Sequence, residues 1–217
     1  MVFVRIALST AAAFLIGAIP WSFIIGKRFY GVDLRNEGSC NLGATNTYRV
    51  LGIRAGLAAA VLDIAKGSTA VALAWLLVPL SYGQAAHDWA LVAATLAAVL
   101  GHSYSPYVGF SGGKGVATAA GAVLILTPKV IPVLLVTWVL VILLTRYVSL
   151  GSIVIAAAYP VLVFLVYGDQ TPFVIFSVLA ASFIIWRHRP NIVRLVQGKE
   201  SKIQIRRGGT LRGGGEG

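Results

Sequence analysis

The sequence has 217 residues, of which 58% are hydrophobic and 12% are charged, and its formal net charge is +11. Soluble domains carry about twice this charged fraction, so an ordinary soluble domain is excluded. The single cysteine excludes an intrachain disulfide and a multi-cysteine metal site. The positive net charge alone would suggest a protein that binds nucleic acid. The positive residues follow the ends of apolar runs, however, which favours contact with membrane surfaces and anionic substrates.

Seven apolar runs follow one another along the chain, and most approach the roughly 20 residues that cross a bilayer core. They cover residues 3–25, 55–78, 89–108, 116–126, 130–144, 150–167 and 172–186. This pattern predicts an all-α integral membrane protein with about seven transmembrane helices, organised as one domain over residues 1–207. The run at 116–126 is short enough for a half-helix or a re-entrant segment, which would change the count. Residues 208–217 are predicted to be a disordered, glycine-rich tail.

The loop between the first two runs contains a dense polar stretch, residues 38–49 (GSCNLGATNTYR). Its glycines allow backbone conformations closed to other residues, and its hydroxyl and amide groups can donate hydrogen bonds. Arg49 adds a planar fork of donors suited to phosphate. Any single Ser or Asn here fits a solvated loop as well, but the whole cluster predicts an anion-binding site.

A second glycine-rich stretch, residues 109–118 (GFSGGKGVAT), follows the third run and is predicted to face the first stretch. Lys114 lies between Gly113 and Gly115 where a helix is expected to start, and the N–H groups at a helix start bind phosphate. The stretch differs from a nucleotide-binding P-loop in spacing, in having Gly115 where Ser or Thr is required, and in lacking a preceding strand. Nucleotide hydrolysis is therefore rejected, and a phosphate site is favoured.

The positive charges predict the orientation in the membrane, because Lys and Arg concentrate in cytoplasmic loops. With the N-terminus outside and the C-terminus in the cytoplasm, only Arg5 and Lys129 remain on the outer side. The cytoplasmic side then holds Lys27, Arg28, Arg35, Arg49, Arg54, Lys114, Arg146 and the basic tail. In this orientation the polar stretches at 38–49, 109–118, 146–152 and 187–191 converge at the cytoplasmic face.

Few chemically active residues lie inside the runs. Asp63 and Lys66 are three residues apart, share a helix face and are expected to pair, either to support the site or to contact substrate. His87 is assigned to the outer link between runs. Paired carboxylates, a Gly-x-Ser-x-Gly elbow and the His-x₄-Asp base of common acyl-CoA acyltransferases are all missing from the sequence.

Together these stretches resemble the bacterial acyl-phosphate-dependent glycerol-3-phosphate acyltransferases of the inner membrane. The resemblance covers nearly the whole chain short of the glycine tail. It rests on GAIPWSFIIGK with VDLR, GSCNLGATN, LDIAKG, GHSYSPYVGFSGGKGVAT, RYVSLGS and RHRPNI, whose order and spacing are together very specific. It implies transfer of a fatty acyl group from acyl phosphate to glycerol 3-phosphate, giving lysophosphatidate and phosphate in phospholipid biosynthesis. It also implies a seven-spanning protein of the bacterial inner (plasma) membrane, with its active site towards the cytoplasm.

The resemblance assigns the site residues to two groups. Those expected to act in catalysis are Ser39, Lys114, Ser152 and His188. Those expected to bind substrate are Asn41, Thr45, Asn46, Arg49, His102, Gly112, Gly113, Ser149 and Asn191. No cofactor or metal is expected. The expected partners are glycerol 3-phosphate, acyl phosphate and membrane lipids, with no nucleic acid, and the protein is expected to be a monomer.

Acyl phosphate is already activated, so the enzyme mainly has to position two anions and offset their charge. We expect a phosphate oxygen of glycerol 3-phosphate to take the hydroxyl proton, because no side chain is obviously poised to do so.

Three positions depart from the usual family pattern. Cys40 replaces Gly, so its thiol is not the family's nucleophile. Ser111 replaces a basic residue, which leaves Lys114 as the only lysine of that motif, and Gly151 stands where Ala is common. The Ser111 exchange is expected to weaken substrate attraction without abolishing activity.

Two other functions are compatible with parts of the sequence. A transporter of organic phosphates would also use basic residues, although no inverted repeat is visible and the polar clusters lie at one face. A membrane scaffold with a lipid-binding basic tail would explain the tail but not the Gly/Asn/Ser loops.

Overall fold

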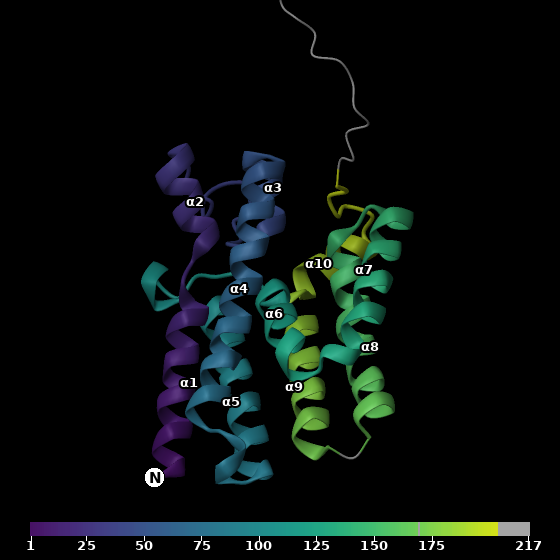
Figure 1. Cartoon of the computed structure of the whole chain (residues 1–217). Coiled ribbons are helices and arrows are strands. Elements are labelled where there is room, and N and C mark those ends of the chain that lie inside the picture. Colours follow the sequence, from purple (N-terminus) through teal and green to yellow (C-terminus); the bar gives the residue numbers. More distant parts are fainter. Residues whose placement is uncertain (169, 204–217) are drawn as a thin grey trace, which may run out of the picture.

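The computed structural model describes residues 1–168 and 170–203, and Figure 1 shows that this part of the chain is built from helices that run roughly side by side. No strand occurs among the described residues, where only an isolated bridge pairs Ser105 with Ser111. The α-helices are α1 Val2–Ala18, α2 Trp21–Tyr30, α3 Ala44–Leu51, α4 Ile53–Leu77, α5 Gln84–Ser103, α6 Val116–Leu126, α7 Ile131–Thr145, α8 Val148–Tyr167, α9 Thr171–Arg187 and α10 Arg189–Val196. The 3₁₀ turns are η1 Leu80–Tyr82, η2 Pro106–Val108 and η3 Pro128–Val130.

Each of the seven apolar runs contains a helix, so the all-α prediction is confirmed for the described residues. Four helical segments there are long and apolar enough to cross a membrane, or five if α9 and α10, which meet at a bend of 57°, form one span. The outer faces of α7 and α8 carry large apolar side chains that are mostly exposed, such as Leu144 at 84% and Leu165 at 72%. Such a surface is stable against lipid rather than water. The count of seven spans and the orientation remain predictions.

The first run is not one continuous helix as expected, because it breaks between α1 and α2. Pro20 lacks the N–H needed to continue the helix, and the residue before a proline is pushed out of helical geometry. Ile19 accordingly has φ −57° and ψ 116°, and α2 restarts at Trp21. The break leaves the carbonyl groups at the end of α1 free to accept hydrogen bonds from other elements.

Two short helices were not predicted, α3 in the first polar loop and α10 after the last apolar run. Both are too polar to resemble a membrane span; α3 lies at the top of Figure 1 beside α2, and α10 lies lower, where it follows α9. They place the polar stretches at 38–49 and 187–191 on ordered backbone rather than on open loops.

Helices pack most closely through small residues, as is usual in membranes. Gly17 of α1 and Gly101 of α5 each lie against the backbone of the other's helix, and Gly67 of α4 and Gly121 of α6 do the same. In all four cases an added β-carbon would overlap that backbone. The helices α1, α4, α5 and α6 therefore form one close-packed group, while α8 packs between α7 and α9, and α9 also contacts α5 and α6.

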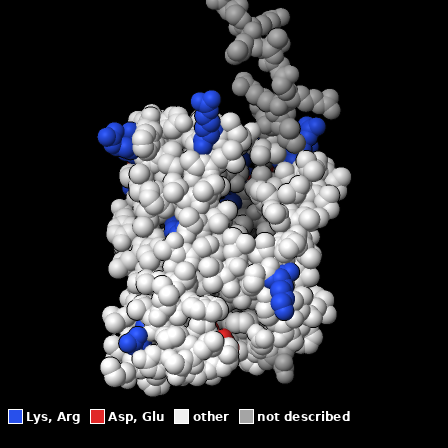
Figure 2. Space-filling model, viewed as in Figure 1, with Lys and Arg blue, Asp and Glu red and all other residues white. Residues whose placement is uncertain are grey.

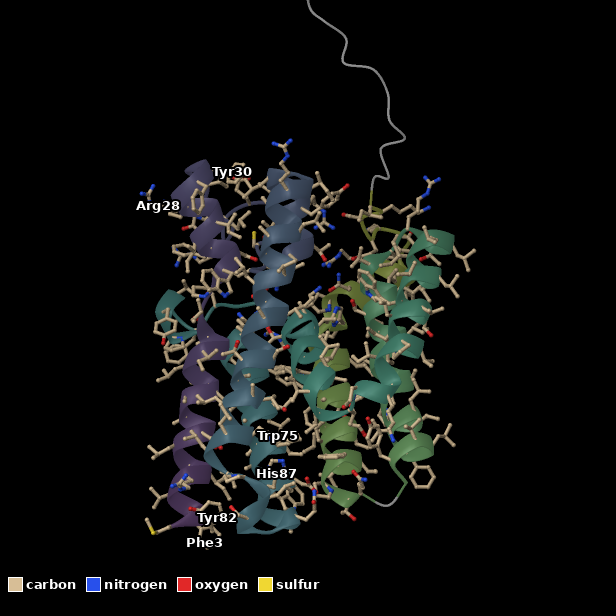
Figure 3. All side chains as sticks on the ribbon, viewed as in Figure 1. Phe3, Arg28, Tyr30, Trp75, Tyr82 and His87 are labelled. Atoms are coloured by element: carbon tan, nitrogen blue, oxygen red, sulfur yellow. The ribbon has the colours of Figure 1, made fainter. Side chains whose placement is uncertain are left out.

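The two ends of the bundle differ in chemistry. Arg28 and Tyr30 lie at the end with α2 and α3, and Phe3 and Tyr82 lie at the opposite end (Figure 3). His87 packs edge-on against Trp75 near that opposite end, with ring centroids 4.6 Å apart, and its Nδ1 is 2.6 Å from the carbonyl of Val78. His87 is thus a buried packing residue remote from the basic end.

Candidate active site

The glycine-rich stretch leads directly into the start of α6. Gly115, with φ +86°, is the residue before the helix, and the first internal bond of α6 runs from the N–H of Ala119 to the carbonyl of Gly115. The N–H groups at the start of a helix have no partner within it and carry partial positive charge. The predicted helix start next to Lys114 is confirmed, and its N–H groups are donors of the kind that bind anions.

Lys114 is the central cation of this site. Its Nζ donates a hydrogen bond to Oδ1 of Asn191 in α10. Burial lowers the pKa of Lys114 to about 8, and the positive charges of Arg194, Arg49 and Arg187 act in the same direction, against the opposing effect of Glu200. An amine that several cations and burial push towards neutrality regains its charge when an anion binds beside it.

Glu200, which follows α10, holds this arrangement together. Its Oε1 accepts hydrogen bonds from Ser149 Oγ at 2.9 Å and from Asn191 Nδ2 at 2.7 Å, and its Oε2 accepts one from Arg194 Nε at 2.8 Å. Partial burial raises the pKa of Glu200, but these three hydrogen bonds outweigh that effect, so the pKa is lowered and the group is a carboxylate. Because lysine only donates and a carboxylate only accepts, the amide of Asn191 has a single orientation, with Oδ1 towards Lys114.

The first polar stretch contacts the glycine-rich stretch, as predicted. Asn41 Nδ2 donates to the carbonyl of Gly112 at 3.2 Å. Arg187, at the end of α9, donates to the carbonyl of Gly113 at 2.8 Å and lies over the ring of Tyr104. Both loop carbonyls are thereby engaged by neighbouring side chains.

Within the first stretch, Asn46 organises the backbone. It is 1% exposed, its Oδ1 accepts the N–H of Ser39 at 2.8 Å, and its Nδ2 donates to the carbonyl of Glu37 at 3.0 Å. Gly38 has φ +63°, and a β-carbon there would overlap Asn46. Ser39, Thr45 and Arg49 are exposed. Asn46 therefore shapes the loop, while the other three side chains are accessible.

The remaining predicted residues have polar groups that already contact other parts of the protein. Ser152 is buried, and its hydroxyl donates to the carbonyl of Val148 within α8 at 3.0 Å. His188 is 3% exposed, and its Nδ1 donates to the carbonyl of Ile184 at 2.8 Å, which places the proton of the neutral ring on that nitrogen. His102 lies behind the loop, with its Nδ1 2.9 Å from Lys66 Nζ. The structure thus brings Lys114 and Asn191 into direct contact, links Ser149 to Asn191 through Glu200, and places His102 behind the loop.

Figure 2 shows that Lys and Arg gather at the end formed by α2 and α3, and that a hollow with basic atoms opens between this side of the molecule and the side formed by α7 and α8. No group of three or more His, Cys, Asp or Glu side chains able to hold a metal occurs in residues 1–168 and 170–203.

Sequence reasoning missed three contributors, Glu200, Arg194 and the direct contact from Arg187. The signal that could have revealed Glu200 is its place as an isolated acid among bases (GKESK). The predicted glycine tail at 208–217 lies outside the described residues.

The fold is that of a helical integral membrane protein, with a cluster of cations and hydrogen-bond donors around Lys114. The pattern of the glycerol-3-phosphate acyltransferase family matches residues 7–198, and the chain belongs to this family. Membership expected from the sequence motifs is confirmed, and the protein is an acyltransferase.

Relatives and solved structures agree with this assignment. The chain is 40% identical over 203 residues to a glycerol-3-phosphate acyltransferase of Desulforamulus reducens, covering 94% of this chain and 98% of the relative. It is also similar to the crystal structure of PlsY (YgiH), an integral membrane glycerol 3-phosphate acyltransferase, in its glycerol 3-phosphate form, with a TM-score of 0.83, 37% identity and coverage of 92% and 96% of the two chains. The lysophosphatidic acid form of that protein gives a TM-score of 0.80 and 34% identity, with coverage of 92% and 95%.

Proposed function

We propose that the protein transfers a fatty acyl group from acyl phosphate to glycerol 3-phosphate, giving lysophosphatidate and phosphate. The observation that carries this proposal is the site's composition. Lys114, the start of α6 and several arginines offset anionic charge, while no dedicated base is paired with a nucleophile among the described residues. Such a site suits a donor that already carries a good leaving group.

In the proposed reaction, a hydroxyl oxygen of glycerol 3-phosphate attacks the carbonyl carbon of acyl phosphate. The bond from that carbon to the phosphate oxygen breaks, and phosphate leaves with the bonding electrons. The hydroxyl proton passes to a phosphate oxygen of glycerol 3-phosphate and from there to the surrounding water. The enzyme lowers the barrier by holding both phosphates and the developing oxyanion close to fixed donors.

The geometry supports distinct roles for the predicted residues. Lys114 and the loop of Gly112 and Gly113 hold one phosphate together with the start of α6. Ser39, Thr45 and Arg49, which are accessible, bind the other substrate from the opposite stretch. Asn41, Asn46, Ser149 and Asn191 position these groups through the hydrogen bonds described above. Ser152 and His188 close the pocket.

We further propose seven spans in the bacterial inner membrane, with the N-terminus outside and the active site towards the cytoplasm. The concentration of basic residues at the α2–α3 end supports this orientation. The protein is proposed to work as a monomer, and the acyl chain to remain in contact with membrane lipids while its phosphate enters the site.

The test is lysophosphatidate formation by purified protein, given glycerol 3-phosphate with either acyl phosphate or acyl-CoA. Lys114→Ala removes the central cation, and Lys129→Ala, which lies at η3 away from the site, is the matched control. We expect product from acyl phosphate alone, retained in Lys129→Ala and lost in Lys114→Ala. Product from acyl-CoA would refute the donor, and accumulation of glycerol 3-phosphate in vesicles without product would favour a transporter.

A further inference from the structure

Three ionisable side chains that the proposed reaction does not use lie together inside the bundle. Asp63 and Lys66 of α4 and His102 of α5 are between 1% and 6% exposed. Lys66 Nζ is 2.9 Å from Asp63 Oδ1, which confirms the predicted ion pair, and His102 Nδ1 is 3.6 Å from the same oxygen. A buried ion pair adds little stability over well-packed apolar residues, so packing of α4 alone does not account for this cluster.

The contact of the Lys66 ammonium with Asp63 Oδ1 is an ion pair without hydrogen-bond geometry, since that buried oxygen has no hydrogen-bond partner among the described residues. The ammonium donates a hydrogen bond to the carbonyl of Ile19 at 2.8 Å and lies 2.9 Å from His102 Nδ1. His102 Nδ1 therefore accepts a hydrogen bond, and the proton of the neutral ring is on Nε2. Through these contacts Lys66 connects the broken end of α1, its own helix and α5 at one point.

His102 in turn forms the rear wall of the glycine-rich loop. Its carbonyl accepts the N–H of Gly113 at 3.1 Å, and the Nε2 edge of its ring lies so close to Gly113 that a β-carbon there would overlap it. On the other side, Arg187 holds the carbonyl of Gly113. Gly113 is thus fixed from both sides, and Lys114 is the next residue along the chain.

We propose that Asp63, Lys66 and His102 form a positioning unit that holds the Gly112–Gly113 backbone in place, so that Lys114 meets the substrate phosphate, without touching substrate themselves. This inference rests on the proposed function, and it gives His102 a different role from the substrate contact expected from the sequence. The unit also makes the loop dependent on the break in the first span, because Lys66 is anchored to Ile19.

The test is steady-state kinetics of four proteins: wild type, His102→Ala, Gly113→Ala and the double variant. Each single change displaces the loop, so we expect KM for glycerol 3-phosphate to rise about tenfold in each, with kcat and KM for the acyl donor changed by less than about threefold. His102→Ala removes the ring that the new β-carbon would strike. The double variant should therefore have a KM for glycerol 3-phosphate no higher than that of the poorer single variant. If the two changes acted independently, this KM would instead rise about a hundredfold.

His87→Ala is the matched control, because His87 is also buried in α5 but lies near the other end and contacts Val78 and Trp75. It should lose stability without a change in KM for glycerol 3-phosphate. Replacing both charges together, Asp63→Asn with Lys66→Met, should reproduce the KM shift of His102→Ala. If His102→Ala does not fold, Gly113→Ala on its own still tests whether displacing this loop raises KM selectively.

Multiplicative effects, a loss confined to kcat, or an equal KM shift in His87→Ala would overturn the inference while leaving the reaction intact. A wild-type protein that forms no lysophosphatidate would instead refute the proposed function, and this inference would fall with it.

Discussion

Lys114 should set the upper pH limit of productive glycerol 3-phosphate binding. Burial and the surrounding arginines lower its pKa to about 8, so the ammonium that meets the phosphate is lost at unusually mild pH. From that value, about nine tenths of Lys114 is charged at pH 7 and about one tenth at pH 9. We expect kcat/KM for glycerol 3-phosphate to fall about tenfold over this range, because this ratio reports the ionisation of the free enzyme.

Two variants test the assignment of this pH limit. Lys114→Arg keeps a positive charge at every accessible pH, so its remaining activity should lack the decline above pH 8. Glu200→Gln removes the carboxylate that raises the pKa of Lys114, so the decline should move to lower pH. The assay is initial rates of lysophosphatidate formation between pH 6 and 10. An unchanged decline in Lys114→Arg, or a wild-type rate that stays level to pH 10, would refute the reasoning.

The structure leads to three further predictions. Cys40 has φ +54°, a conformation that glycine adopts without strain, so Cys40→Gly should raise the free energy of unfolding by about 1 kcal/mol, measured as a higher Tm in detergent. The variant should keep full activity, and a loss of activity would contradict the view that the thiol is dispensable. Gly67→Val should push α4 away from α6 and abolish or severely lower the yield of folded protein on gel filtration. Ala65→Val, on the exposed face of α4, should be tolerated. Equal losses of folded protein in the two variants would contradict the role of the glycine contact. Cys40 is exposed near the basic end, so a membrane-impermeant maleimide should label it in inside-out vesicles but not in intact cells. Ser81→Cys in a Cys40→Ala background is the control and should show the reverse pattern. Labelling of Cys40 in intact cells would mean that the proposed orientation is inverted.

The helical architecture follows from the sequence because a bilayer leaves few alternatives. Apolar runs of near-spanning length must satisfy their backbone groups internally, and they do so as helices. Hydropathy did not reveal two features, a short polar helix and a local break in the first span. The helix α3 is too polar to register as a span, and the break before Pro20 falls inside an uninterrupted apolar run.

The site was predicted as a set of convergent stretches, but the roles of single residues were not. A sequence shows that Asn46 and His102 can form hydrogen bonds without showing whether their partners are substrate, backbone or another side chain. In the structure Asn46 serves the backbone of its own loop, and His102 faces Lys66. Glu200 was missed for a related reason, since the basic residues around it suggested a solvated tail.

The position of Glu200 has a consequence for how the protein matures. The 38–49 stretch is synthesised early, yet Asn191, which accepts from Lys114, also donates to a carboxylate that follows the last helix. During synthesis, the membrane can therefore hold a chain with almost all of its helices inserted while Lys114 still lacks its aligned partner. The hydrogen-bond network around Lys114 is therefore complete only once Glu200, beyond the last helix, has been made.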